Sequence, residues 1–167
     1  MAVFVFTLAV AGDRAEGQSN AFIYHDSLAS GWNDWSWSCT RDFNNPSPKY
    51  GGSKSIAVTY DAWGALSLQH EDLPVTNWHY LDFYIHGGTN RNMDLQVYLV
   101  YSNTEFAALR LTNYLAGGAI TSSFKKAHIP MADFNCTSQK FTRVNWKNNA
   151  GQGWGTIYLD EILLVNS

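Results

Sequence analysis

The sequence predicts an all-β protein: a two-sheet antiparallel β-sandwich with the topology of a jelly roll. Strand-like runs of four to ten residues recur along the chain and are rich in β-branched and aromatic residues. Turn-forming clusters of Gly, Pro and Asn, such as NNPSPKYGGS, GGTNRN and NNAGQGWG, separate these runs. No segment keeps a convincing 3.6-residue apolar period over three turns, so we expect no long amphipathic helix.

The first half of the chain supplies four of the expected strands. The run at 21–24 is AFIY, and the run at 35–43 begins with aromatic residues that alternate with serine. In the run at 54–60, isoleucine and valine alternate with small residues, and the run at 65–70 is ALSLQH. This alternation is typical of a strand with one buried face.

The second half supplies six more expected strands, at 80–86, 94–101, 105–111, 124–130, 141–146 and 156–165. YLDFYIH and DLQVYLVY each place three aliphatic or aromatic side chains on one side. The alternative for the run at 105–111 is a helix, because the propensities of the longer segment 105–117, EFAALRLTNYLAG, tolerate one. The core of the sandwich is predicted to contain Ile56, Val58, Phe83, Ile85, Val97 and Leu99.

The N-terminal segment, 1–20, is expected to precede a single folded domain at 21–167. Residues 2–11 form a continuous apolar run that is too short to span a bilayer and fits the h-region of a secretory signal. A small, polar stretch follows it, as expected of a linker after cleavage. We therefore expect a secreted protein; the alternative is that the apolar run is a buried first strand.

Cysteine usage and one tripeptide bear on the same question. Asn135-Cys136-Thr137 is an N-glycosylation acceptor if the chain passes through a eukaryotic secretory pathway, which predicts a glycoprotein. Cys39 and Cys136 can pair in an oxidising compartment or remain as two buried thiols, and the sequence leaves both readings open. The two cysteines have no CxxC spacing and do not indicate a zinc site.

Charge excludes two classes of partner. The formal net charge is −3, and the longest basic feature is the pair Lys125-Lys126. A chain with so little positive charge lacks the field that binds nucleic acid or an anionic membrane surface. We expect a monomer with neither kind of partner.

The side of each strand opposite the core carries an unusual set of residues. Alternation places Tyr84 and His86 there on one strand, and Gln96 and Tyr98 on another. A simple solvent face would carry Lys, Glu and Thr, so the four residues predict an aromatic-polar face that binds a ligand. The alternative is ordinary cross-strand packing.

Seven tryptophans in one short chain suggest stacking platforms for sugar rings, although indoles also fill cores. Trp35 and Trp37 are two residues apart and share a face of a strand. Trp63 and Trp154 lie beside glycines, where exposure is expected. Trp146 lies in a run that allows either orientation. These five residues join the aromatic-polar face as candidate carbohydrate-binding residues.

Several pieces of the chain, taken in order, resemble one known family. IYHDSLASGWNDWSW, GGSKSIAVTYDAWGALSLQH, LDFYIHGG, LQVYL and GTIYLDEILLV are similar to β-jelly-roll carbohydrate-binding modules of the galactose-binding-domain-like type. The resemblance covers about residues 22 to 166. It implies binding of a plant or microbial polysaccharide without catalysis, in a module of the kind appended to secreted glycoside hydrolases. The two cysteines and the glycosylation tripeptide depart from the family pattern.

The resemblance also implies a structural calcium ion between the N-terminal segment and the last strand. Asp160 is the best candidate ligand and Asp26 the second, and the turn from Tyr50 to Lys54 is expected to supply carbonyl oxygens. The alternative is that the two acids are a surface pair or cap turns.

Catalytic motifs are scarce, so we do not expect an enzyme. Glycoside hydrolysis needs two carboxylates at a set separation, and Asp82 with Asp94 is the best available pair. The sequence therefore predicts a secreted, non-catalytic protein that binds a polysaccharide, most simply a β-linked glucan such as cellulose. The alternatives are a small jelly-roll lyase or hydrolase and a structural wall protein. The sugar, its linkage, and end-on or internal binding stay open.

Overall fold

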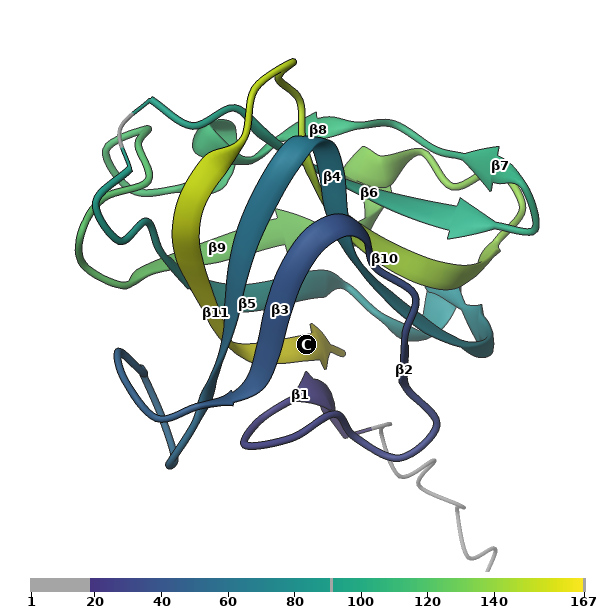
Figure 1. Ribbon diagram of the computed structural model, residues 1–167. Helices are drawn as coiled ribbons and strands as arrows, with labels where there is room; N and C mark the ends of the chain where they lie inside the picture. Colours follow the sequence, from purple (N-terminus) through teal and green to yellow (C-terminus); the bar gives the residue numbers. More distant parts are fainter. Residues whose placement is uncertain (1–18, 91, 167) are drawn as a thin grey trace, which may run out of the picture.

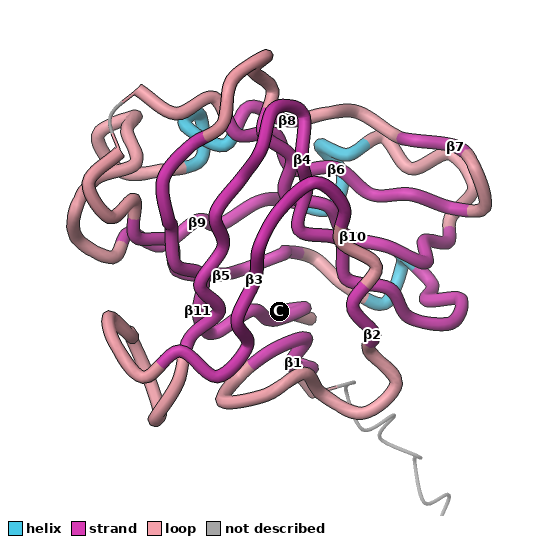
Figure 2. The backbone as a smooth tube through the Cα atoms, in the orientation of Figure 1, coloured by secondary structure: helices cyan, strands magenta, loops and turns pink. Residues whose placement is uncertain are grey.

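The structure is a computed structural model that describes residues 19–90 and 92–166. The expected secretory segment at 2–11 lies outside the described residues. The described chain consists of eleven strands and three short 3-10 turns, with no α-helix (Figures 1 and 2). None of the helical turns in the described part of the chain is long and apolar enough to cross a membrane.

The strands are β1 (Ala21–Tyr24), β2 (Asn33–Asp34), β3 (Trp37–Asn45), β4 (Ser55–Pro74), β5 (Tyr80–His86), β6 (Leu95–Tyr101), β7 (Thr104–Glu105), β8 (Leu109–Arg110), β9 (Lys125–Pro130), β10 (Lys140–Asn148) and β11 (Trp154–Val165). The 3-10 turns are η1 (Val75–Asn77), η2 (Leu111–Tyr114) and η3 (Met131–Phe134). All strand pairings are antiparallel, and the hydrogen-bonded path runs β7-β6-β10-β4-β11-β5-β9.

The path folds into two layers because β4 contributes to both. The β5 sheet contains β3, the first part of β4, β11, β5 and β9. The β6 sheet contains β2, the second part of β4, β10 and β6, with short β7 and β8 at its edge. Strand β1 pairs with β11 close to the C terminus (Figure 1).

Strand β4 passes from one sheet to the other at Trp63, which has a left-handed backbone (φ 60°). At the next residue, Gly64, a Cβ atom would come within 1.9 Å of the Ser38 carbonyl oxygen, so the crossing of β3 and β4 requires glycine. The sequence indicated two separate strands around this Trp-Gly pair. The residues bend one 20-residue strand and do not end it.

The core between the sheets confirms the sequence-based fold class. All six predicted core residues are fully buried: Ile56, Val58, Phe83, Ile85, Val97 and Leu99. Phe83 of β5 and Trp146 of β10 meet edge to face, with ring centroids 5.4 Å apart, so they join strands of opposite sheets. Trp146 is fully buried, so it is a core residue that a ligand cannot reach. Its neighbours on β10, Asn145 and Lys147, point to the opposite side of the strand.

The segment at 105–111 differs from expectation, and the cysteines adopt one of the two states that the sequence left open. The segment 105–111 forms only the short strands β7 and β8, and then η2 begins at Leu111, which is fully buried. Cys39 and Cys136 are both free thiols that donate to backbone carbonyls, of Ala65 and Lys140 respectively. Burial raises the pKa of Cys39 to about 11, which keeps this thiol un-ionised at neutral pH.

Candidate functional site

The outer surface of the β6 sheet brings together two of the candidate tryptophans. Leu66 and Leu68 of β4 point into the core, so Ser67 and its alternate neighbours point outward. The Trp35 backbone N–H donates to the Ser67 carbonyl over 2.9 Å, and Trp37 lies opposite Ala65. Trp35 and Trp37 therefore flank the outward residues of β4 on the same surface.

Polar residues continue this surface across β10 and β6. Arg143 lies opposite Gln69 on one side and Val100 on the other, while Asn145 lies between Ser67 and Tyr98. We call the resulting surface the Trp35 face. Its accessible residues are Trp35, Trp37, Gln69, Gln96, Arg143 and Lys147, and Ser67, Tyr98 and Asn145 lie buried among them.

Trp35 is the most exposed large apolar residue of the described chain, at 56%. The guanidinium carbon of Arg143 lies 5.8 Å from the centroid of the Trp35 ring, within cation–π range. An Arg143 Nη2–H group donates to the Ser102 carbonyl over 3.3 Å, which orients the guanidinium. The arrangement holds a large flat ring and a planar donor side by side at the surface.

A pocket of about 410 Å³ lies beside this pair. Its lining includes Trp35, Gln69, Asp72, Tyr101 and Arg143. The Tyr101 hydroxyl donates to Asp72 over 3.2 Å. The pocket thus combines an aromatic wall with amide, carboxylate, hydroxyl and guanidinium groups, which can pack against the C–H face of a sugar and exchange hydrogen bonds with its hydroxyls.

Beneath the surface, three polar atoms lie in one cross-strand row. Ser67 Oγ, Asn145 Oδ1 and the Tyr98 hydroxyl are buried, and none has a hydrogen-bond partner among the described residues. Burial raises the pKa of Tyr98; Asn145 and Glu105 lie near its hydroxyl without normal hydrogen-bond geometry. A buried polar group without a partner costs about 1–3 kcal/mol, so this row favours an added water or ligand hydroxyl.

The expected aromatic-polar face is divided between the two sheets. Gln96 and Tyr98 belong to the Trp35 face, but Tyr84 and His86 lie on the outer side of the β5 sheet. The Tyr98 side chain is also nearly buried, at 2% exposure. Alternation shows which residues share one side of a strand, but it does not show to which sheet the strand belongs.

The remaining candidate tryptophans lie at the end of the sandwich where β4 bends. Trp63 is 53% exposed, and its carbonyl accepts a hydrogen bond from Trp37 Nε1 over 3.2 Å. Trp154 is half-buried and donates from Nε1 to Asn148 Oδ1 over 2.8 Å. Trp63 therefore adjoins the Trp35 face, whereas Trp154 is held by its own loop.

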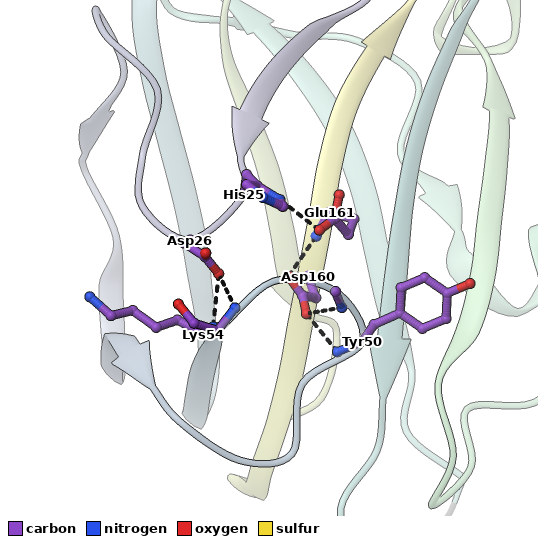
Figure 3. A network of polar contacts seen from close by, with 8 residues as sticks. His25, Asp26, Tyr50, Lys54, Asp160 and Glu161 are labelled. Carbon is purple, nitrogen blue, oxygen red and sulfur yellow. Dashed lines mark hydrogen bonds and ion pairs between the residues drawn. The ribbon is translucent and has the colours of Figure 1, made fainter.

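The two candidate metal ligands form a carboxylate clasp around the loop at 50–54 (Figure 3). Asp160 Oδ2 accepts hydrogen bonds from the backbone nitrogens of Tyr50 (2.6 Å) and Gly51 (3.1 Å). Asp26 Oδ1 accepts from the backbone nitrogens of Ser53 (2.6 Å) and Lys54 (2.8 Å). The two carboxylates thus hold both halves of the loop.

This donor set does not fit the calcium ion that the resemblance implied. The loop directs N–H groups toward the carboxylates, where calcium would require carbonyl oxygens. Glu161, the third acid nearby, is paired with His25 Nδ1 over 2.6 Å. Across the described residues, no group of three or more His, Cys, Asp or Glu side chains is placed to hold a metal ion.

Sequence reasoning missed three residues that the structure brings to the surface sites. Arg143 and Tyr101 line the pocket next to Trp35, and Tyr50 stacks on Tyr84 with ring centroids 3.5 Å apart. The sequence held no clear signal for Arg143, because its run allowed either orientation. Tyr50 lies in a loop, where no periodicity applies.

Comparisons with known proteins agree with this architecture. Among solved structures, the chain is similar to a family 29 carbohydrate-binding module from Piromyces equi, with a TM-score of 0.57 and 17% identity over 89% of this chain and 91% of that chain. It is also similar to a family 29 module variant complexed with cellulohexaose, with a TM-score of 0.58 and 14% identity over 87% and 89% of the chains.

A family 11 module from Clostridium thermocellum, in complex with a β-1,3-1,4-mixed-linked tetrasaccharide, gives a TM-score of 0.58 and 12% identity over 89% and 96% of the chains. The TM-scores of these structures show a shared fold, the β-sandwich of carbohydrate-binding modules. They confirm the fold that the sequence predicted. None of the curated proteins matches the chain. The family model of the expansin-like protein C-terminal domain matches residues 23–167, and the chain therefore belongs to that family.

Proposed function

We propose that this domain binds a polysaccharide, most simply a β-linked glucan such as cellulose, on the Trp35 face and outside the cell. The observation that carries the proposal is the pairing of an exposed Trp35 ring with the Arg143 guanidinium at the mouth of a pocket. An exposed indole offers a flat apolar area to a pyranose ring, and the flanking planar groups offer hydrogen bonds to its hydroxyls.

The ligands of the structural neighbours support the choice of sugar. Two family 29 module variants are complexed with mannohexaose and with cellulohexaose, and the family 11 module is complexed with a β-1,3-1,4-mixed-linked tetrasaccharide. Each of these oligosaccharides is an uncharged chain of pyranose rings, which suits a surface built from one large aromatic ring and several amide and hydroxyl groups.

The residues that line the pocket support binding without catalysis. Of the described residues that line it, Asp72 is the sole carboxylate. Asp72 accepts from Tyr101 and lies 3.4 Å from Lys140 Nζ, and hydrolysis of a glycoside needs a second carboxylate across the bond. The best carboxylate pair in the sequence was Asp82 with Asp94. Asp82 lies on β5 and Asp94 directly precedes β6 of the other sheet, and neither lines this pocket.

An extracellular location follows from the proposed ligand. Asn135, the acceptor of the glycosylation tripeptide, is exposed at the end of η3, where an oligosaccharide can be attached. We therefore propose that Asn135 is N-glycosylated.

The test is a pull-down with a panel of insoluble polysaccharides, followed by titration with soluble oligosaccharides. The parent should bind at least one β-glucan, and Trp35→Ala should bind it more weakly. Phe22→Ala is the matched control, because Phe22 is also an exposed ring, at 41%, but lies on β1 away from the face. Release of reducing ends during incubation would favour a hydrolase, and no binding to any polysaccharide would favour a structural role.

A further inference from the structure

We infer that the outer side of the β5 sheet carries a second carbohydrate-stacking surface, the Tyr50 platform, made of Tyr50, Tyr84 and Phe124. The domain would then hold two glycan chains at once, one on each sheet. This inference rests on the proposed function of the Trp35 face, but it concerns different residues on a different sheet.

The platform has one ring open to solvent and two that support it. Tyr50 lies on Tyr84 with ring centroids 3.5 Å apart and an interplanar angle of 13°. Phe124 meets Tyr50 edge to face at 5.9 Å. Tyr50 is still 52% exposed, so the side of its ring that faces away from Tyr84 is open. An open, supported phenol ring presents the flat apolar area on which a pyranose ring stacks.

The carboxylate clasp explains why this loop tyrosine is held in place. Asp160 lies directly opposite Tyr84 in the pairing of β11 with β5, and it accepts the backbone N–H groups of Tyr50 and Gly51. The carboxylate clasp therefore anchors the loop that carries Tyr50 (Figure 3), and it does so from a residue paired with Tyr84. A Cβ atom at Gly51 would come within 2.2 Å of Glu161 Oε1, so a larger residue there would displace the Glu161 side chain. A ring fixed before binding loses little conformational entropy when a ligand arrives.

The charges around the platform suit an uncharged polyol. The Tyr50 hydroxyl and then burial raise the pKa of Tyr84 to about 12, so this phenol is neutral at physiological pH. Asp82, the outward acid of β5, is paired with Lys126 and His128 of β9, each over 2.6 Å. Asp82 is therefore not an isolated negative charge beside the platform.

Polar groups for sugar hydroxyls lie next to the rings. The Gly88 backbone N–H donates to His86 Nδ1 over 2.9 Å, which places the ring proton of a neutral His86 on Nε2 as a donor. His86 also contacts Phe124 and Tyr158, at ring centroid distances of 5.1 and 5.6 Å. The platform thus repeats the combination of flat rings and planar donors that marks the Trp35 face.

The two surfaces cannot serve one short ligand. They are the outer sides of two sheets that share the core between them, as the contact of Phe83 with Trp146 shows. A glycan on the Tyr50 platform is therefore separated from a glycan on the Trp35 face by the whole sandwich. Two occupied surfaces would bridge two polysaccharide chains, and linked binding sites raise the apparent affinity for a dense polysaccharide.

A bridging experiment tests this inference. Beads that carry a β-glucan are incubated with the protein and then with the same glucan in a fluorescent, soluble form. The fluorescence recruited to the beads measures bridging, and the amount of protein on the beads measures binding. The variants are Trp35→Ala, Tyr50→Ala and the double variant, with Tyr50→Phe as the control that keeps the ring. Near-UV circular dichroism and a melting curve check each fold.

We expect the parent and Tyr50→Phe to bind and bridge. Each single alanine variant should bind but lose the bridging signal, because a protein with one site cannot hold two chains. The double variant should lose binding. If Trp35→Ala alone abolishes binding, or if Tyr50→Ala bridges like the parent, the Tyr50 platform is wrong while the proposed function stands. If the folded parent binds no glucan bead, the proposed function fails first, and the platform fails with it.

Discussion

The carboxylate of Asp160 accepts a hydrogen bond from the backbone nitrogen of Tyr50 over 2.6 Å, although the two residues are 110 positions apart in the sequence. Asp160 is fully buried, and its second oxygen accepts the backbone N–H of Glu161 over 2.8 Å. The last strand thereby anchors the loop between β3 and β4. Several properties of the domain depend on this contact.

Replacing Asp160 by asparagine should destabilise the fold. An amide has one acceptor oxygen and turns an NH₂ group toward the remaining backbone donors, so an N–H group of the loop or of Glu161 loses its partner. We expect a loss of about 2–3 kcal/mol in the free energy of unfolding, the usual size for hydrogen bonds to a charged group. Urea denaturation measures it. The matched control is Asp61→Asn, an exposed aspartate of β4; equal stability of the two variants would contradict the clasp.

The contribution of Asp26 should depend on pH. Backbone hydrogen bonds from Ser53 and Lys54 lower the pKa of Asp26 below its ordinary value of 3.8. Because the folded-state pKa is the lower one, the stabilisation is fully present above pH 3.8 and is lost as the pH falls through the folded-state pKa.

The difference in urea midpoint between the parent and Asp26→Asn should therefore be constant at about pH 5–7 and shrink toward about pH 2. Urea denaturation at a series of pH values measures this difference. A difference that stays the same at the lowest pH would show that the Asp26 carboxylate does not stabilise the loop through its charge.

Calcium should not be needed for stability. The clasp carboxylates already accept N–H groups of the loop, so a cation would have to displace these bonds. We expect the melting temperature to be the same with excess chelator and with millimolar calcium. A ligand of the native state stabilises it by mass action, so a rise in melting temperature with calcium concentration would contradict our account of the clasp.

The sequence was sufficient for the core because alternation depends only on which side of a strand is buried. Phe83 and Ile85 of β5, and Val97 and Leu99 of β6, all lie where alternation placed them. The paired strands were also found, except that β4 continues through Trp63 and that 105–111 is mostly not strand. A left-handed residue inside a strand leaves no periodic signal.

The candidate site was harder to predict because it depends on how strands are distributed between sheets. Tyr84 and Tyr98 have equivalent positions in their own strands, yet they lie on opposite sides of the sandwich. The sequence identified Asp160 as important, but only the structure shows that N–H groups surround its carboxylate. Contacts of this kind are set by loop geometry and not by residue spacing.

Arg143 should contribute to glycan binding through its geometry as well as its charge. Its guanidinium lies over Trp35 and donates to Ser102, and a lysine ammonium cannot reproduce a planar donor in that position. We expect both Arg143→Ala and Arg143→Lys to weaken binding about 3- to 10-fold, in line with a cation–π contact and one hydrogen bond. Calorimetric titration measures the affinities. Lys54→Ala removes a positive charge from the loop at 50–54, and an equal loss of affinity in that variant would point to net charge alone.

The most direct test of the central claim is calorimetric titration of the parent, Trp35→Ala and Phe22→Ala with a soluble β-glucan hexasaccharide. Loss of the exposed Trp35 ring should cost about 1–3 kcal/mol, which weakens binding at that face about 5- to 150-fold, because the ring supplies the apolar area that a sugar buries. Phe22→Ala should bind like the parent. If folded Trp35→Ala binds the hexasaccharide with the affinity and stoichiometry of the parent, the Trp35 face is not a glycan-binding site.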